Sequence, residues 1–206
     1  MTSIETAPRT TTLRTITRWT TFTGGPLFWL GTLLHPARDG WSIAAVGERY
    51  GLTHDLQALG LGLQVAALAS MIALSKERRD LRSWYAALAG TLFWFALIVF
   101  DGSHNPVRAE YAPNIVHEPA DLNTPAALIV FPALLIFPLG YAWLARTLSR
   151  RGLTLPGVLL GVGAIAYTLG GLFIFTSGPR FGLIQIFEVA GATLYAVGYV
   201  LLGRRA

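Results

Sequence analysis

Long apolar runs recur along this chain and constrain its fold more than any other feature. Several reach about twenty residues, the length that an α-helix needs to cross the roughly 30 Å hydrocarbon core of a bilayer. Hydrophobic residues make up 53% of the 206 residues. The pattern predicts an all-α protein, a polytopic membrane bundle of about six transmembrane helices. The spans are expected at residues 19–35, 52–75, 84–103, 125–145, 155–177 and 181–203.

The segments between these runs predict one domain. None of them is long enough to act as a linker between folding units, so residues 1–206 are expected to form a single transmembrane helical domain. Residues 41–50 carry apolar side chains at helical spacing beside Glu48 and Arg49. This pattern is typical of a short amphipathic helix lying on the membrane interface.

The basic residues predict an orientation. Twelve of the 16 lysines and arginines fall on the side of the two termini, and only Arg38, Arg49, Arg108 and Arg180 fall on the other side. Under the positive-inside rule both termini are therefore cytoplasmic, as expected for a multi-pass protein of a bacterial plasma membrane. Anionic headgroups of membrane lipids account for the net charge of +5, so the charge indicates no nucleic-acid partner.

Polar residues that carry chemistry gather toward the outer side. All four histidines and eight of the 11 carboxylates lie there, and the chain has no cysteine. A cysteine nucleophile and thiolate metal ligands are thereby excluded. Together with glutamines and aromatic residues at helical spacing, they form stripes on four predicted spans. Such stripes turn inward because lipid cannot satisfy the hydrogen bonds of their polar groups. By span, the stripes hold Phe28 and His35; His54, Gln57 and Gln64; Trp94, Asp101 and His104; and Gln185, Glu188 and Tyr195.

Acids buried beside aromatic rings predict proton chemistry. Burial penalises the charged form of a carboxyl group, so an embedded acid can donate a proton, and aromatic faces stabilise the positive charge that follows. A histidine would remove the final proton. The catalytic candidates are Asp101, Glu188, His104, His54 and Asp55. The candidates for substrate binding are Trp94, Phe28, Trp29, Gln57, Gln64, Gln185 and Tyr195, with Arg108 and Arg180 for an anionic headgroup or diphosphate.

The acid that closes the aromatic segment FWFALIVFD, residues 93–101, supports a resemblance at the level of architecture. The chain resembles the small integral-membrane terpene cyclases of bacterial and fungal natural-product pathways, and the likeness extends over nearly its whole length. The DxDD signature of soluble class II cyclases is absent. The resemblance implies a cyclase or isomerase that protonates an isoprenoid-like, lipophilic small molecule and needs no cofactor.

Other interpretations remain open. His35, His54, Asp101 and His104 could bind Zn or Fe where helices end, or histidines could bind haem, although the spacing matches no known metal motif. Proline- and glycine-containing spans also allow a transporter or a lipid-binding protein. Each candidate has a structural explanation too: Glu188 could be a protonated acid bonded to Gln57, and Asp101 could cap a turn. The sequence leaves the oligomeric state open.

Overall fold

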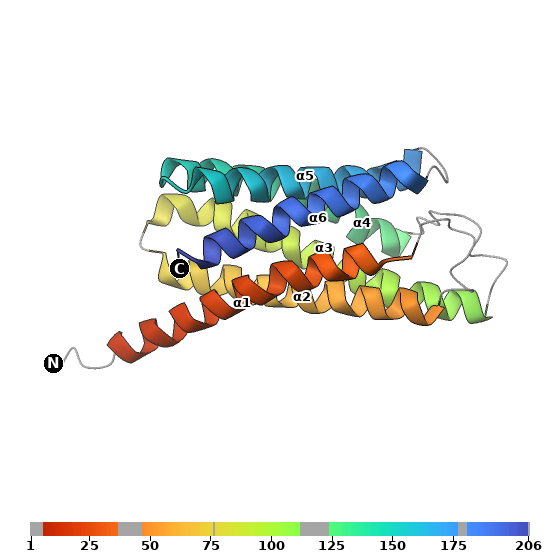
Figure 1. The fold of residues 1–206 in the computed structure, drawn as a ribbon, viewed down its shortest axis with the longest axis horizontal. Coiled ribbons are helices and arrows are strands. Elements are labelled where there is room, and N and C mark those ends of the chain that lie inside the picture. The colour runs from red at the N-terminus through yellow and green to blue at the C-terminus, as the bar shows by residue number, and fades with distance from the viewer. Residues whose placement is uncertain (1–5, 37–46, 76, 112–123, 177–180, 206) are drawn as a thin grey trace.

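The computed structural model describes residues 6–36, 47–75, 77–111, 124–176 and 181–205, and these residues form an all-α bundle (Figure 1). The predicted fold class is thereby confirmed. The described residues contain six helices and no strand. The helices are α1 (Thr6–Leu34), α2 (Gly47–Leu74), α3 (Arg78–Tyr111), α4 (Thr124–Arg150), α5 (Thr154–Thr176) and α6 (Phe181–Gly203).

Five of these helices, α2 to α6, are long and apolar enough to cross a membrane. Helix α1 is not among them, because its first half carries Arg9, Arg14 and Arg18 among many threonines. Most predicted spans match the helices within a few residues. The largest differences are α1, which begins at Thr6 rather than near residue 19, and α3, which continues to Tyr111 rather than ending near residue 103. Residues 41–46 of the predicted interfacial helix lie outside the described residues, and residues 47–50 form the first turn of α2.

The six helices form a closed ring. Among the described residues each helix packs against its neighbours in chain order, and α6 returns to pack against α1. Both termini therefore lie at one end of the bundle, and the start of α1 projects beyond it (Figure 1). We call the opposite end the histidine end, because His35 and His54 lie there. In this ring α3 and α6 occupy opposite sides.

Glycines bring the backbones of successive helices into direct contact. The closest pairs are α1 with α2, α3 with α4 and α5 with α6. Gly24 and Gly60 face each other between α1 and α2, and Gly163 and Gly191 do the same between α5 and α6. Small residues are the usual means of close helix packing in membranes, where apolar side chains gain little by leaving lipid. The ring is thus built from three tightly packed helical hairpins.

Aromatic side chains fill the centre of the ring. A ring without a central helix leaves an axial space that only large side chains can close, and the rings here pack against one another. Trp94 of α3 lies 4.9 Å from Phe137 of α4 and 5.3 Å from Tyr167 of α5, between ring centroids. Tyr167 also lies 4.9 Å from Phe28 of α1. Phe28, Trp94, Phe137, Tyr141, Tyr167, Tyr195 and Tyr199 are all buried.

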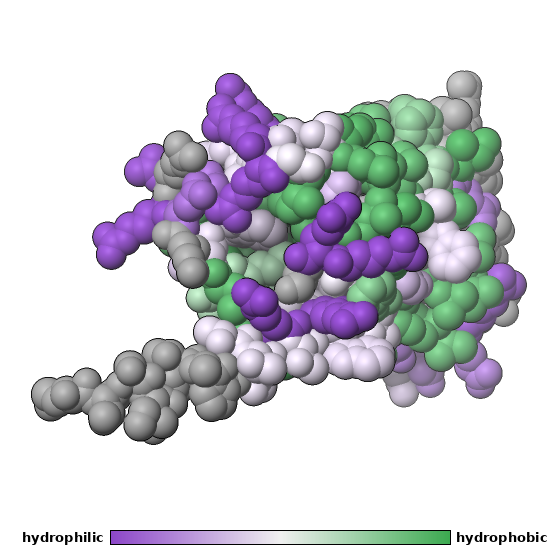
Figure 2. Space-filling view, turned by 60° about the vertical axis from the view of Figure 1, so that its left-hand side comes forward, coloured by the Kyte–Doolittle hydropathy of each residue, from purple (hydrophilic) through white to green (hydrophobic). Residues whose placement is uncertain are grey.

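The surface agrees with a membrane environment. Large apolar side chains on α4, including Leu128, Phe131, Leu135 and Leu139, are exposed. Figure 2, in which the end with the termini comes forward, shows hydrophilic side chains gathered at that end and apolar side chains along the flank of the bundle. An apolar flank of this extent would be unfavourable in water but is expected against lipid.

Candidate functional site

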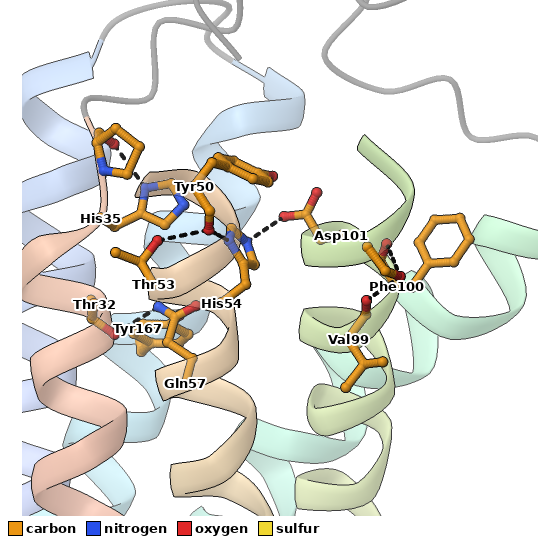
Figure 3. Close-up of polar contacts among 12 residues, drawn as sticks. Thr32, His35, Tyr50, Thr53, His54, Gln57, Val99, Phe100, Asp101 and Tyr167 are labelled. Carbon is orange, nitrogen blue, oxygen red and sulfur yellow. Dashed lines mark hydrogen bonds and ion pairs between the residues drawn. The ribbon is translucent and has the colours of Figure 1, made fainter. Parts of the chain in front are cut away.

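A buried histidine and a partly exposed aspartate meet at the histidine end (Figure 3). The Nε2 atom of His54 on α2 lies 3.1 Å from the Oδ2 atom of Asp101 on α3. The His54 side chain is 1% exposed and the Asp101 side chain 24% exposed. One end of the pair therefore reaches the bundle interior and the other end reaches the surface. The two residues are 47 positions apart in the sequence, and the packing of α2 on α3 joins them.

The hydrogen bond of the other ring nitrogen of His54, Nδ1, shows which nitrogen carries a hydrogen. The Nδ1 atom is 2.8 Å from the backbone carbonyl oxygen of Tyr50, one turn earlier in α2. A carbonyl oxygen can only accept a hydrogen bond, so Nδ1 carries a hydrogen and donates it. A hydrogen bond between Nε2 and Asp101 then requires one further proton, carried either by Nε2 as imidazolium or by the carboxyl group. This is an arrangement in which a proton can pass between the two side chains.

The glycine that follows Asp101, Gly102, is required by close packing against His54. A Cβ atom at Gly102 would overlap the Cβ and the ring of His54. A larger residue would therefore push α3 away from α2 or turn the imidazole away from the carboxyl group. We interpret the Asp-Gly sequence that follows the aromatic segment as a packing requirement of the His54–Asp101 pair.

A second histidine packs on the first. The His35 ring stands edge-on to the His54 ring with centroids 4.9 Å apart, and the Tyr50 ring lies 4.1 Å from that of His54. The Nδ1 atom of His35 is 2.8 Å from the carbonyl oxygen of Pro36, so it too carries a hydrogen. His35 and Tyr50 thus cover His54 from the outer side, which keeps its ring buried.

This geometry does not favour the metal and haem alternatives. Donation from Nδ1 to a backbone carbonyl is common for metal-binding histidines. However, the described side chains contain no group of three or more possible ligands able to hold a metal ion. Two imidazoles in edge contact also leave no room for a porphyrin between them. The side chain of His104, a further predicted ligand and base, lies outside the described residues, as do those of Arg108 and Arg180.

Below the pair, Gln57 links three helices. Its Nε2 atom donates to the hydroxyl oxygen of Thr32 on α1 at 3.0 Å and to that of Tyr167 on α5 at 3.4 Å. Gln57 follows His54 by three residues, so the two side chains share one face of α2 (Figure 3). We call Gln57, Thr32, Tyr167 and Trp94 the inner layer, since all four are buried.

Gln64, predicted alongside Gln57, has both of its polar atoms paired. Its Nε2 atom donates to the carbonyl oxygen of Gly24 at 3.2 Å, and its Oε1 atom accepts from the hydroxyl of Tyr195 at 2.8 Å. These bonds join α2 to α1 and α6. The contacts of Gln64 and Tyr195 are those of structural residues that hold helices together.

Glu188 enters the bundle on the other side of the ring. Its side chain is 4% exposed and packs where a Cβ atom of Gly170 would lie, between α5 and α6. Glu188 and His54 each lie seven residues into their helices from the histidine end, or about 10 Å. Asp101 and Glu188 therefore lie in the same half of the bundle, but one belongs to the α2–α3 contact and the other to the α5–α6 contact.

The remaining predicted residues lie farther from the pair. Asp55 is exposed although it follows His54, because successive residues of a helix point in different directions. Trp29 donates from Nε1 to the hydroxyl of Thr193 at 2.9 Å and so links α1 to α6. Gln185 is half-buried. The sequence interpretation missed Tyr50, Tyr167 and Gly102; a tyrosine within the apolar fifth span was the signal available for Tyr167.

Comparison of the chain with protein families, with characterised proteins and with solved structures finds no match. The fold and the geometry of the His54–Asp101 pair therefore carry the functional argument.

Proposed function

We propose that this protein is a membrane-embedded acid–base enzyme of the cyclase or isomerase type, acting on an isoprenoid-like lipophilic substrate. The observation that carries the proposal is the partly buried contact between His54 and Asp101, in which the direction of the Tyr50 hydrogen bond leaves one proton to share. The histidine end would face outward and both termini the cytoplasm of a bacterial cell, as the distribution of basic residues predicts.

The proposed reaction balances without any other reactant. The proton that His54 and Asp101 share passes to one carbon of a carbon–carbon double bond, whose π electrons form the new C–H bond. The resulting carbocation lies among the aromatic rings below the pair, whose faces stabilise positive charge. A neighbouring C–H bond then breaks, its electrons form a new double bond, and the proton returns to His54. The product is an isomer of the substrate, or a ring if a second double bond first attacks the cation.

Asp101 and Glu188 have different roles in this proposal. Asp101 stabilises the imidazolium and, being partly exposed, exchanges protons with water at the membrane surface. Glu188 is the second buried acid, and its place on the opposite side of the ring suits a proton donor to the other end of a long substrate. Exclusion of water by the packed interior protects the cation from capture.

A comparative substrate screen tests the proposal. Membranes containing the wild type, Asp101→Asn or Glu188→Gln are incubated in D₂O with farnesol, geranylgeraniol and squalene, and the extracts are analysed by mass spectrometry. We expect the wild type to yield an isomer carrying deuterium on carbon, because the acid takes its proton from solvent. Asp101→Asn should yield almost no product. Undiminished product from both variants would reject the proposal. Transfer of an unchanged compound across the membrane would instead indicate a transporter.

A further inference from the structure

Two buried polar groups of the inner layer have no hydrogen-bond partner among the described residues. They are the Oε1 atom of Gln57 and the Nε1 atom of Trp94. The two side chains are 0% and 3% exposed, and both contact Tyr167, one at its hydroxyl and the other at its ring. Within a membrane no bulk water reaches such groups, so leaving them unsatisfied costs free energy.

The unsatisfied atom of Gln57 does not depend on how its amide is oriented. The amide nitrogen already faces two hydroxyl oxygens, those of Thr32 and Tyr167. Exchanging the nitrogen and the oxygen would lose the bond to Thr32, whose hydroxyl hydrogen goes to the carbonyl oxygen of Phe28, and one amide atom would again have no partner. Gln57 therefore offers one hydrogen-bonding group to something other than its protein neighbours.

Comparison with a second tryptophan and a second glutamine, Trp84 and Gln64, shows what distinguishes Trp94 and Gln57. Trp84, also on α3, has a buried Nε1 atom without a described partner, but it lies four residues from the start of its span, at the membrane interface that suits tryptophan. Trp94 lies nine residues from the nearer end of the same span. Gln64 is buried like Gln57, yet both of its polar atoms are paired. Among the described residues deep in the bundle, Gln57 and Trp94 thus carry the unsatisfied groups, and both contact Tyr167.

We propose that the inner layer binds the hydroxyl group of a lipophilic alcohol. A hydroxyl accepts from Trp94 Nε1 and donates to Gln57 Oε1, whereas an ether or ester only accepts and a hydrocarbon does neither. The four residues of the layer carry no charge, so a diphosphate or carboxylate would lack a counter-ion here. This inference rests on the proposed function for its site: Gln57 lies one turn below His54, so a hydroxyl bound there places its carbon chain against the aromatic rings. A water molecule offers the same hydroxyl chemistry.

Ligand-induced stabilisation of the purified full chain distinguishes the alcohol from water. The probes are farnesol and farnesyl methyl ether at equal detergent concentration, and the shift of the thermal unfolding midpoint gives each dissociation constant. We expect farnesol to bind the wild type about tenfold more tightly than the ether, roughly the effect of one hydrogen bond. Gln57→Leu should reduce this preference severalfold, because only the alcohol donates to its Oε1 atom. Trp94→Phe should weaken the binding of both probes severalfold, because both accept from its Nε1 atom. Trp84→Phe, the matched control, should leave the binding of both probes unchanged.

Equal binding of farnesol and its ether by the wild type would overturn the inference and assign the layer to water. A preference that persists in Gln57→Leu, or binding of both probes that is undiminished in Trp94→Phe, would also overturn it, since the hydroxyl would then bind elsewhere. If Gln57→Leu fails to fold, Trp94→Phe decides the result, because phenylalanine keeps a ring in that position. The assay needs no turnover. A clear alcohol preference without any product would support this inference and reject the acid–base enzyme.

Discussion

Substitution of His54 by glutamine is expected to lower kcat/KM by about 10²- to 10⁴-fold, the usual contribution of a general acid or base. Glutamine can still hydrogen-bond to Asp101 but cannot carry a proton to a substrate. Because His54 is the only residue of the pair that reaches the interior, the loss should appear mainly in kcat. Steady-state kinetics on the substrate found in the screen measures both constants.

Two further variants separate proton transfer from packing. Gly102→Ala keeps both members of the pair but crowds His54, so it should lower kcat to an intermediate value without abolishing it. Glu48→Gln removes an exposed acid in the first turn of α2, the helix that carries His54, and should leave the kinetics unchanged.

A His54→Gln enzyme that retains a third or more of wild-type activity would contradict the role assigned to His54.

The second large effect concerns the contact between α1 and α2. Replacement of Gly60 by alanine is expected to destabilise the protein by about 1–3 kcal/mol, as overpacking usually does. The new Cβ atom would lie 2.5 Å from the backbone nitrogen of Phe28 and 2.8 Å from the carbonyl oxygen of Gly24. Both neighbours are backbone atoms, so the two helices must separate. Unfolding in detergent, followed by circular dichroism, measures the change.

Gly62→Ala is the matched control, two residues along the same helix. A Cβ atom there would meet only the Phe95 ring at 3.8 Å, an ordinary contact. Alanine favours helix over glycine by up to about 1 kcal/mol, so this variant should be as stable as the wild type or more stable. Equal stability of the Gly60→Ala and Gly62→Ala proteins would show that the helices do not pack as closely as described.

The sequence predicted the bundle because the length and composition of an apolar run are local properties. The helix ends were less predictable: α3 continues past His104 to Tyr111, although the sequence there is polar and contains Pro106, a residue that usually ends a helix. The failure of α1 to match the other five spans was visible in its threonines and arginines. These features depend on residues close together in the chain.

The site depended on which helices are neighbours, and periodicity alone does not supply that. Helical spacing placed His54 and Asp101 on inward faces and at the outer end, but the partner of each came from the packing of α2 on α3. Helical spacing also placed Asp101 and Glu188 on inward faces, but it could not show that the closed ring puts α3 and α6 on opposite sides. The packing role of Gly102 could be seen only once the position of His54 was known.

The central claim is that the buried His54 and the partly exposed Asp101 share a proton, and nitrogen NMR of the four histidines tests it most directly. Protein labelled with ¹⁵N-histidine is compared with His54→Gln, which assigns the His54 signals, and with Asp101→Asn. We predict that His54 has a hydrogen fixed on Nδ1, and that its Nε2 resonance shifts strongly in Asp101→Asn. A His54 ring that exchanges freely between its two neutral forms, with an Nε2 resonance indifferent to Asp101→Asn, would contradict the account.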